Sequence, residues 1–145
     1  MAPVTKEKGT LVTGVIGNDV HISGIRILEY ALQKAGFKIV SLGAMTPAED
    51  FINAAIETKA NVILVSSLNG HAKICCEGFR DKCIEAGLKD IIIYLGGYLV
   101  VGTTAWDEAE KKFKAMGIDR VYPPATSPSL AIEHLEADIA TRRRK

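Results

Sequence analysis

Five short apolar runs, rich in Val, Ile and Leu, alternate with longer amphipathic segments along the chain. A continuous apolar run of this kind, bounded by turn residues, predicts a buried strand. The predicted strands cover residues 11–16, 37–42, 61–66, 91–95 and 120–122. Strands that are apolar on both faces need helices on both sides, so the pattern favours a parallel sheet.

The segments between the runs carry apolar residues at helical spacing and have recognisable ends. A first helix follows residue 24 and stops at Gly36, which accepts the left-handed conformation of a helix end. A second helix has Thr46 as N-cap, Pro47 as its first residue and Glu49 closing a capping box. Its buried stripe is predicted to consist of Phe51, Ile52, Ala55 and Ile56.

The same strand and helix unit recurs in the second half of the chain. One continuous helix is predicted over residues 70–86, and another, capped by Thr104, carries Trp106 and Phe113 on its buried side. The last helix opens with Ser127 as N-cap and Pro128 as first residue. Five units of this kind predict a flavodoxin-like (Rossmann-like) α/β fold, a three-layer doubly wound sheet of five parallel strands in the order 2-1-3-4-5.

A chain of 145 residues has room for one domain of ordinary size. We therefore expect a single domain over residues 1–145, with a core from about residue 10 to about residue 140 and a solvated basic tail at residues 142–145. The formal net charge of +1 gives no field that would attract nucleic acid or an acidic membrane surface.

Location and cysteine chemistry can also be predicted. The first ten residues lack the apolar segment of a secretory signal, and the longest mostly apolar stretch, residues 91–101, is too short to span a membrane. Cys75, Cys76 and Cys83 are odd in number and show no C-x-x-C spacing, so we expect packing residues in a reducing compartment, the cytoplasm.

In an open parallel sheet, ligands bind beyond the carboxyl ends of the strands. Small, glycine and hydroxyl residues follow the predicted strands at that edge, but two common nucleotide motifs, G-x-G-x-x-G and G-x-x-x-x-G-K-[ST], are absent. A phosphorelay receiver would place an acidic residue where this chain has Ser66. The sequence therefore argues against dinucleotides, nucleoside triphosphates and a receiver aspartate.

The loop after the first strand contains Asp19, His21 and Gly24. An imidazole can bind a metal through one ring nitrogen while the other donates its proton to a carboxylate, and a glycine lets a bulky planar group approach the backbone. Zinc needs three or four protein ligands, and His71 lacks companions of the right type. A single histidine suits a metal that a macrocycle already holds. The side chains of His71, Lys73 and His134 are expected to be exposed to solvent.

Three short motifs occur in order, each after its predicted strand. They are D-x-H-x-x-G at Asp19, His21 and Gly24, then S-x-L at Ser66 and Leu68, then the pair Gly96 and Gly97. Together they resemble the signature of cobalamin-binding domains. The stretches EDFINAAIETKA, EAGLKD and FKAMGIDRVYPPATSP extend the likeness to the small (sigma) subunits of glutamate mutase, also called methylaspartate mutase, over roughly residues 10–135.

The resemblance implies adenosylcobalamin bound base-off and His-on, with His21 as the lower axial cobalt ligand in place of the cofactor's dimethylbenzimidazole. Asp19 would accept the hydrogen bond of His21, while Ser66 and Leu68 would contact the buried tail beside Gly96 and Gly97. The implied cofactor-binding residues are Asn18, Asp19, Val20, His21, Ile22, Gly24, Ser66, Ser67, Leu68, Gly70, Gly96, Gly97, Tyr98, Leu99, Val100, Val101, Gly102, Tyr122 and Thr126.

The resemblance also implies the reaction, a radical rearrangement that interconverts L-glutamate and threo-3-methylaspartate. No acid-base pair or arginine cluster for a dicarboxylate remains on this chain, so no catalytic residue for the substrate is expected here. A larger barrel-type (epsilon-like) catalytic subunit should hold glutamate, in a heterotetramer of two small and two large subunits, without nucleic acid or membrane.

Two other functions remain open from the sequence. A corrinoid methyl carrier would usually place a helical bundle ahead of this domain, whereas the first strand here begins by about residue 10. A cobalamin sensor would normally be fused to an output domain. Mutases of other types carry the domain on the barrel chain, and a separate domain therefore favours the glutamate type.

Overall fold

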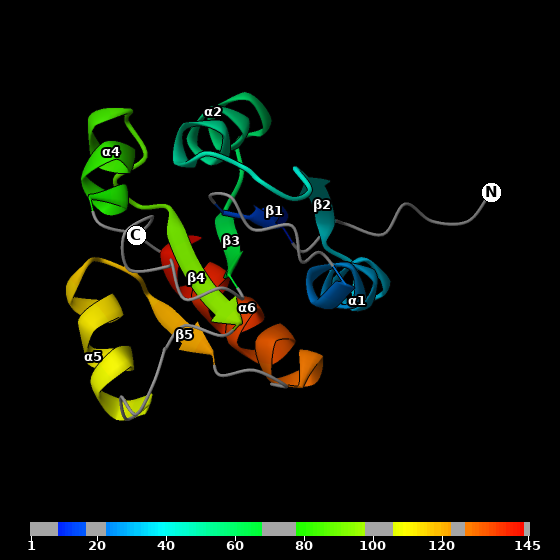
Figure 1. Cartoon of the computed structure of the whole chain (residues 1–145). Coiled ribbons are helices and arrows are strands. Elements are labelled where there is room, and N and C mark those ends of the chain that lie inside the picture. Colours follow the sequence, from blue (N-terminus) through cyan, green and yellow to red (C-terminus); the bar gives the residue numbers. More distant parts are fainter. Residues whose placement is uncertain (1–8, 17–22, 68–77, 98–105, 123–126, 144–145) are drawn as a thin grey trace.

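The computed structural model describes residues 9–16, 23–67, 78–97, 106–122 and 127–143 (Figure 1). Strands and helices alternate along the chain. The strands are β1 (Thr10–Val15), β2 (Lys38–Ser41), β3 (Val62–Ser67), β4 (Ile92–Gly97) and β5 (Arg120–Tyr122). The helices are α1 (Ser23–Lys34), α2 (Ala48–Thr58), α4 (Phe79–Glu85), α5 (Trp106–Ala115) and α6 (Pro128–Arg143).

The strands form one parallel sheet in the order β2-β1-β3-β4-β5, which confirms the predicted topology. Helices α1 and α6 cover one face, and α2, α4 and α5 cover the other (Figure 1). The central strands are buried on both sides because each face is covered, whereas the edge strand β2 is half-exposed. Burial on both faces is the reason why the central strands are mostly apolar along their whole length.

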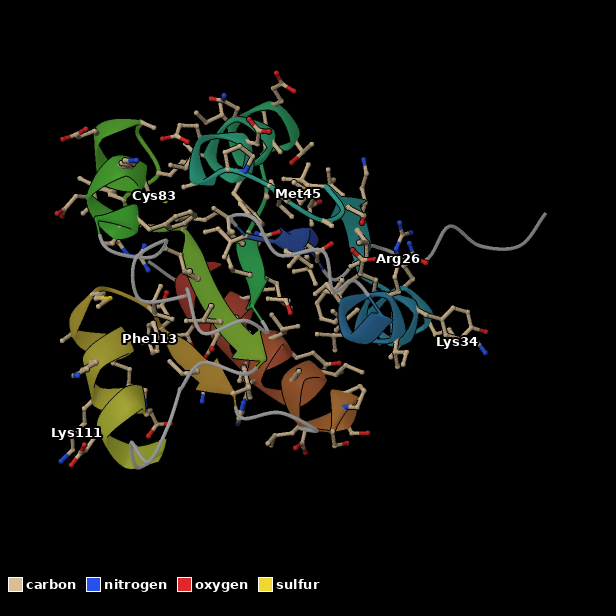
Figure 2. All side chains as sticks on the ribbon, viewed as in Figure 1. Arg26, Lys34, Met45, Cys83, Lys111 and Phe113 are labelled. Atoms are coloured by element: carbon tan, nitrogen blue, oxygen red, sulfur yellow. The ribbon has the colours of Figure 1, made fainter. Side chains whose placement is uncertain are left out.

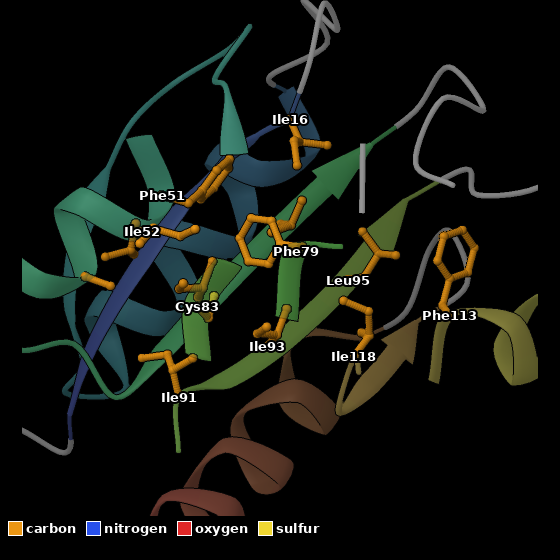
Figure 3. Close-up of a cluster of buried hydrophobic side chains, with 14 of the residues drawn as sticks. Ile16, Phe51, Ile52, Phe79, Cys83, Ile91, Ile93, Leu95, Phe113 and Ile118 are labelled. Atoms are coloured by element: carbon orange, nitrogen blue, oxygen red, sulfur yellow. The ribbon is translucent and has the colours of Figure 1, made fainter. Parts of the chain in front are cut away.

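Each face of the sheet has its own apolar cluster, because successive side chains of a strand point to opposite faces. On the face of α2, α4 and α5, Phe51 and Phe79 meet edge to face with ring centroids 6.3 Å apart, above Ile93 and Leu95 of the sheet (Figure 3). Cys83 is fully buried in this cluster, which confirms the packing role predicted for it. On the other face, α1 and α6 bury Leu32 and Leu135.

Two predicted helix ends are confirmed. Gly36 has a φ of 107°, a conformation that a side chain would disfavour, and it follows the last turn of α1. At the start of α6, the Ser127 hydroxyl accepts a hydrogen bond of 3.2 Å from the amide of Ser129, with Pro128 as the first helical residue. In both places, local chemistry alone fixes the boundary.

The cap predicted for α2 is wrong. The helix begins one residue later, with Pro47 at the N-cap position and no side-chain cap, so Glu49 closes no capping box there. Thr46 is buried, and both of its donors are used elsewhere. Its amide donates to the carbonyl of Val15 at 2.9 Å, and its hydroxyl donates to the carbonyl of Gly43 at 3.2 Å. Pairing with the end of β1 therefore outcompetes the capping arrangement at Thr46.

Two further predictions in the helices are wrong. Ile56 is 45% exposed, because the buried side of α2 ends with Phe51, Ile52 and Ala55. The single helix expected over residues 70–86 does not run through Gly78, whose φ of 76° is left-handed and directly precedes α4. The apolar spacing of this segment is helical on the α4 side, but a left-handed residue cannot continue a right-handed helix.

The described surface carries polar and charged side chains together with exposed apolar ones such as Ile27, Tyr30 and Met45. Lys34 and Lys111 extend from the outer sides of α1 and α5 (Figure 2). Within the described ranges, no helix is both long and apolar enough to cross a membrane.

Candidate functional site

Three of the residues predicted to bind the cofactor lie side by side at the carboxyl edge of the sheet. Val15 of β1 pairs with Ser66 of β3, Ser66 pairs with Gly96 of β4, and Gly96 pairs with Tyr122 of β5. Side-chain alternation places this row on the face covered by α1 and α6. The next pair outward is Ser67 and Gly97. The sheet thus brings the S-x-L serine and the first glycine of the pair together, as the motifs predict.

The described residues leave space where Gly96 lacks a side chain. Among them, a Cβ built there would meet only Cβ of Tyr122 at 3.8 Å and its carbonyl oxygen at 4.0 Å, which are ordinary contacts. Gly96 also has no positive φ. Gly14 on the opposite face differs, because its Cβ would come within 3.1 Å of the Phe51 ring. Close packing against Phe51 therefore explains why position 14 is a glycine. At position 96 the described residues leave room for a methyl group, so their packing does not explain the glycine there.

Tyr122 is held in this row by α6. Its hydroxyl lies 2.7 Å from Nδ1 of His134, and the two rings stack with centroids 5.7 Å apart. The phenol donates this hydrogen bond when the imidazole carries its proton on Nε2. Burial raises the pKa of Tyr122 to about 12, so the hydroxyl remains a donor at neutral pH. His134 is half-buried, not the solvated residue expected from the sequence.

A polar network below Tyr122 ties α6 to β4 and β5. Arg120 donates two hydrogen bonds to the Asp138 carboxylate, at 2.7 and 3.0 Å, and the Tyr94 hydroxyl donates to the same carboxylate. The hydrogen bonds from Arg120 lower the pKa of Asp138, and burial raises that of Tyr94. The ring centroids of Tyr94 and Tyr122 lie 5.5 Å apart, so the network also supports the position of Tyr122.

Val15 and Ile16, which precede the predicted histidine loop, are hydrogen-bonded to neighbouring segments. The amide of Ile16 donates to the carbonyl of Ser66 at 3.1 Å, and the amide of Val15 donates to that of Gly43 at 2.8 Å. Helix α1 begins at Ser23, with Gly24 as its second residue. Ile16, the last described residue before the predicted histidine loop, therefore lies at the carboxyl edge of the sheet, hydrogen-bonded to Ser66.

Many of the predicted site residues lie outside the described ranges. These are Asn18, Asp19, Val20, His21, Ile22, Leu68, Gly70, Tyr98, Leu99, Val100, Val101, Gly102 and Thr126. Their roles stay predictions, including the axial role of His21. Among the residues that are described, no group of three or more His, Cys, Asp or Glu side chains could hold a metal ion.

Two surface hollows lie at the opposite, amino edge of the sheet. One is lined by Ile92, Arg120 and Asp138, and the other by Asn61, Asp90 and Ile92. Ligands of open parallel sheets bind at the carboxyl edge, and the amino edge carries none of the predicted motifs. The row of Ser66, Gly96 and Tyr122 is therefore the candidate site.

The architecture defines a doubly wound α/β domain, and this row is a candidate ligand site at the carboxyl edge of its sheet. The model of the B12 binding domain matches residues 9–133, and the chain therefore belongs to the B12-binding domain family. Two curated relatives, both named glutamate mutase sigma subunit, match nearly their whole length. The protein of Clostridium tetani is 54% identical over 133 residues, which are 92% of this chain and 97% of the relative. That of Carboxydothermus hydrogenoformans is 57% identical over 129 residues, 89% and 94% of the two chains. These matches confirm the resemblance to the sigma subunits.

Solved structures support the same fold. A novel cobalamin-binding protein from Desulfitobacterium hafniense superimposes with a TM-score of 0.75 at 18% identity, over 92% of this chain and 60% of that one. The monomethylamine corrinoid protein of Methanosarcina barkeri gives 0.74 at 26% identity, over 91% and 59%. This chain spans about three fifths of their length. The sigma subunits match it at about twice the identity, which favours the mutase over the methyl carrier.

Proposed function

We propose that this chain is the cobalamin-binding subunit of an adenosylcobalamin-dependent glutamate mutase, which interconverts L-glutamate and threo-3-methylaspartate. The observation that carries the proposal is the identity of more than half of all aligned residues with glutamate mutase sigma subunits over nearly their whole length. The space beside Gly96, in register with Ser66 and Tyr122, supports it. We propose residues 1–145 as one domain.

The chain's own residues would hold the cofactor in two places. Ser66, Gly96 and Tyr122 would line the channel for the nucleotide tail, with Leu68 and Gly97 beside them. His21 would bind cobalt through one ring nitrogen, and Asp19 would accept a hydrogen bond from the other ring N–H, which would fix the tautomer and raise the basicity of the ligand. When bound, adenosylcobalamin supplies a 5′-deoxyadenosyl radical by homolysis of its cobalt–carbon bond.

The substrate would bind on another chain. A larger barrel-type catalytic subunit would cover the upper face of the corrin and hold glutamate, in an assembly of two small and two large subunits. The sigma-subunit names of the relatives support a larger partner. The role of this chain would therefore be to bind, orient and shield the cofactor, with the active site completed at the subunit interface.

The test is reconstitution. The purified chain is mixed with adenosylcobalamin and a glutamate mutase large subunit, and methylaspartate is assayed with glutamate as substrate. Product is expected only when both chains and the cofactor are present. Absence of product, together with methyl transfer from the methylcobalamin-loaded chain to a methyltransferase, would replace this function with that of a corrinoid carrier.

A further inference from the structure

A buried polar pair connects the two elements that flank the histidine loop. The hydroxyl of Thr13 in β1 donates a hydrogen bond to the carboxylate of Glu29 in α1. Thr13 is 0% exposed and Glu29 6% exposed. Among the described residues, Thr13 is the one hydrogen-bond partner of the Glu29 carboxylate. A carboxyl group is rarely buried so fully with a single hydroxyl partner.

Most of the side chains near the pair are apolar, although Thr13 is in register with Ser41 of β2. Along the strand, Thr13 lies between Leu11 and Val15, and along the helix Glu29 lies one turn from Ile25 and near Leu32. All these apolar neighbours belong to the cluster between the sheet and helices α1 and α6. Two apolar side chains of similar shape would stabilise such a site at least as well as a hydrogen-bonded pair. Stability alone therefore does not explain this pair.

A hydrogen bond depends on the direction between its two groups, whereas apolar packing does not. Apolar contact is non-directional and tolerates a helix that slides along a sheet, whereas a hydrogen bond holds donor and acceptor at one distance and angle. A slide by one residue moves a helix by about 1.5 Å, and ligand-to-metal distances vary by only about 0.2 Å. A small shift of α1 would therefore be enough to misplace a ligand that its N-terminal loop carries.

The pair is placed to prevent such a shift. Thr13 lies two residues before Val15, where β1 ends, and the next amide, that of Ile16, donates to the carbonyl of Ser66 in β3. Glu29 lies six residues after Ser23, where α1 begins. The loop with His21 spans only residues 17–22 between these ends. The height of α1 against β1 thus determines where both ends of this loop lie.

We propose that Thr13 and Glu29 are positioning residues for the axial histidine: their buried hydrogen bond fixes α1 against β1 and so places His21 under the corrin ring. This inference rests on the proposed function, because it assigns the pair a role toward the cobalt ligand. The pair does not touch the cofactor. It acts through the loop that joins the two elements.

The experiment separates stability from ligation. The central variant is the double substitution Thr13→Val with Glu29→Leu, which removes both polar groups and leaves no orphaned partner. Its free energy of unfolding is measured by urea denaturation of the chain without cofactor. Ligation is measured with reduced cobinamide, a corrinoid that lacks the nucleotide tail, through its affinity and through the nitrogen splitting in its electron spin resonance spectrum. Cobinamide reports on the histidine without the tail channel.

The double variant is expected to unfold at the same or a higher urea concentration than the unmodified chain. Its affinity for cobinamide should nevertheless fall at least about tenfold, as for residues that support a metal ligand, and its nitrogen splitting should weaken. Thr13→Ser keeps the hydroxyl donor and should retain both signals, whereas Thr13→Val should lose them. Val62→Ala, in the same cluster but at the start of β3, is the control that lowers stability without changing the spectrum.

Two results would overturn the inference, and they are distinguishable. Cobinamide affinity within about twofold of the unmodified chain, with unchanged splitting in the double variant, would show that any apolar packing places the histidine equally well. If the unmodified chain itself shows no histidine nitrogen on cobalt, the proposed function fails and this inference fails with it. Should the double variant not fold, the comparison of Thr13→Ser with Thr13→Val decides the question.

Discussion

Replacing Gly96 with alanine should separate folding from cofactor binding. Among the residues that the structure describes, the new methyl group would meet only Tyr122, at 3.8 and 4.0 Å, and the backbone of Gly96 has no positive φ. An alanine that fits without strain stabilises a protein by about 0.4–1 kcal/mol, because it restricts the unfolded chain. The substitution Gly96→Ala should therefore leave the free energy of unfolding equal or slightly higher.

The same methyl group should weaken cobalamin binding. It would occupy the space proposed for the nucleotide tail, and overfilling a packed site costs about 1–3 kcal/mol. This range corresponds to a loss of about 5- to 150-fold in affinity. Cobinamide lacks the tail, so its affinity for the Gly96→Ala variant should not change. The contrast between the two corrinoids locates the effect in the tail channel.

The assay combines urea denaturation of the chain without cofactor with titration of both corrinoids by absorbance. Gly14→Ala is the matched control, because its methyl group would press on the Phe51 ring at 3.1 Å on the opposite face. It should lose about 1–3 kcal/mol of stability and keep the affinity of the folded fraction for cobalamin. Unchanged cobalamin affinity in the Gly96→Ala variant would refute the reasoning about the channel.

Three further predictions concern the rest of the fold. Asp119→Ala removes the carboxylate that accepts hydrogen bonds from the half-buried Arg80 guanidinium and from the amide of Ile93. It should lower the free energy of unfolding by about 1.5–3 kcal/mol in urea, with an unchanged corrinoid spectrum. Cys83, whose pKa burial raises to about 11, should react with a thiol reagent at pH 8 only on unfolding, in a chain whose other cysteines are serine. The hydrogen bonds from Arg120 lower the pKa of Asp138 in the folded state. The ionised carboxylate therefore stabilises the fold above about pH 4, and this contribution is lost as the pH falls through the lowered pKa. Asp138→Asn should flatten the decline of the free energy of unfolding at acid pH.

The sequence predicts the sheet well because its strands are continuous apolar runs and strand alternation with helices restricts the topology. The ends of β5 and the cap at Ser127 are correct to the residue, since both depend on local chemistry. Thr46 fails for the opposite reason. Its backbone is paired with the end of β1, a partner about thirty residues away that no local motif reveals.

The candidate site shows the same division. The motifs predicted Ser66 and Gly96, and the family resemblance added Tyr122. The register brings the three together because each lies at or next to the carboxyl end of its strand. His134 was missed, since its contact with Tyr122 joins two elements across the α6 face without any motif spacing. The Thr13 and Glu29 pair was missed for a related reason, because a polar residue inside an apolar pattern is read as exposed.

The central claim is that His21 replaces the cofactor's own base on cobalt. The most direct measurement is the electron spin resonance spectrum of the chain loaded with reduced cobalamin, prepared with ordinary and with nitrogen-15 histidine. Labelling is expected to change the nitrogen splitting from a triplet to a doublet, and His21→Ala is expected to abolish this change. A triplet that persists with labelled histidine would mean that the benzimidazole still binds the metal, and it would contradict the account.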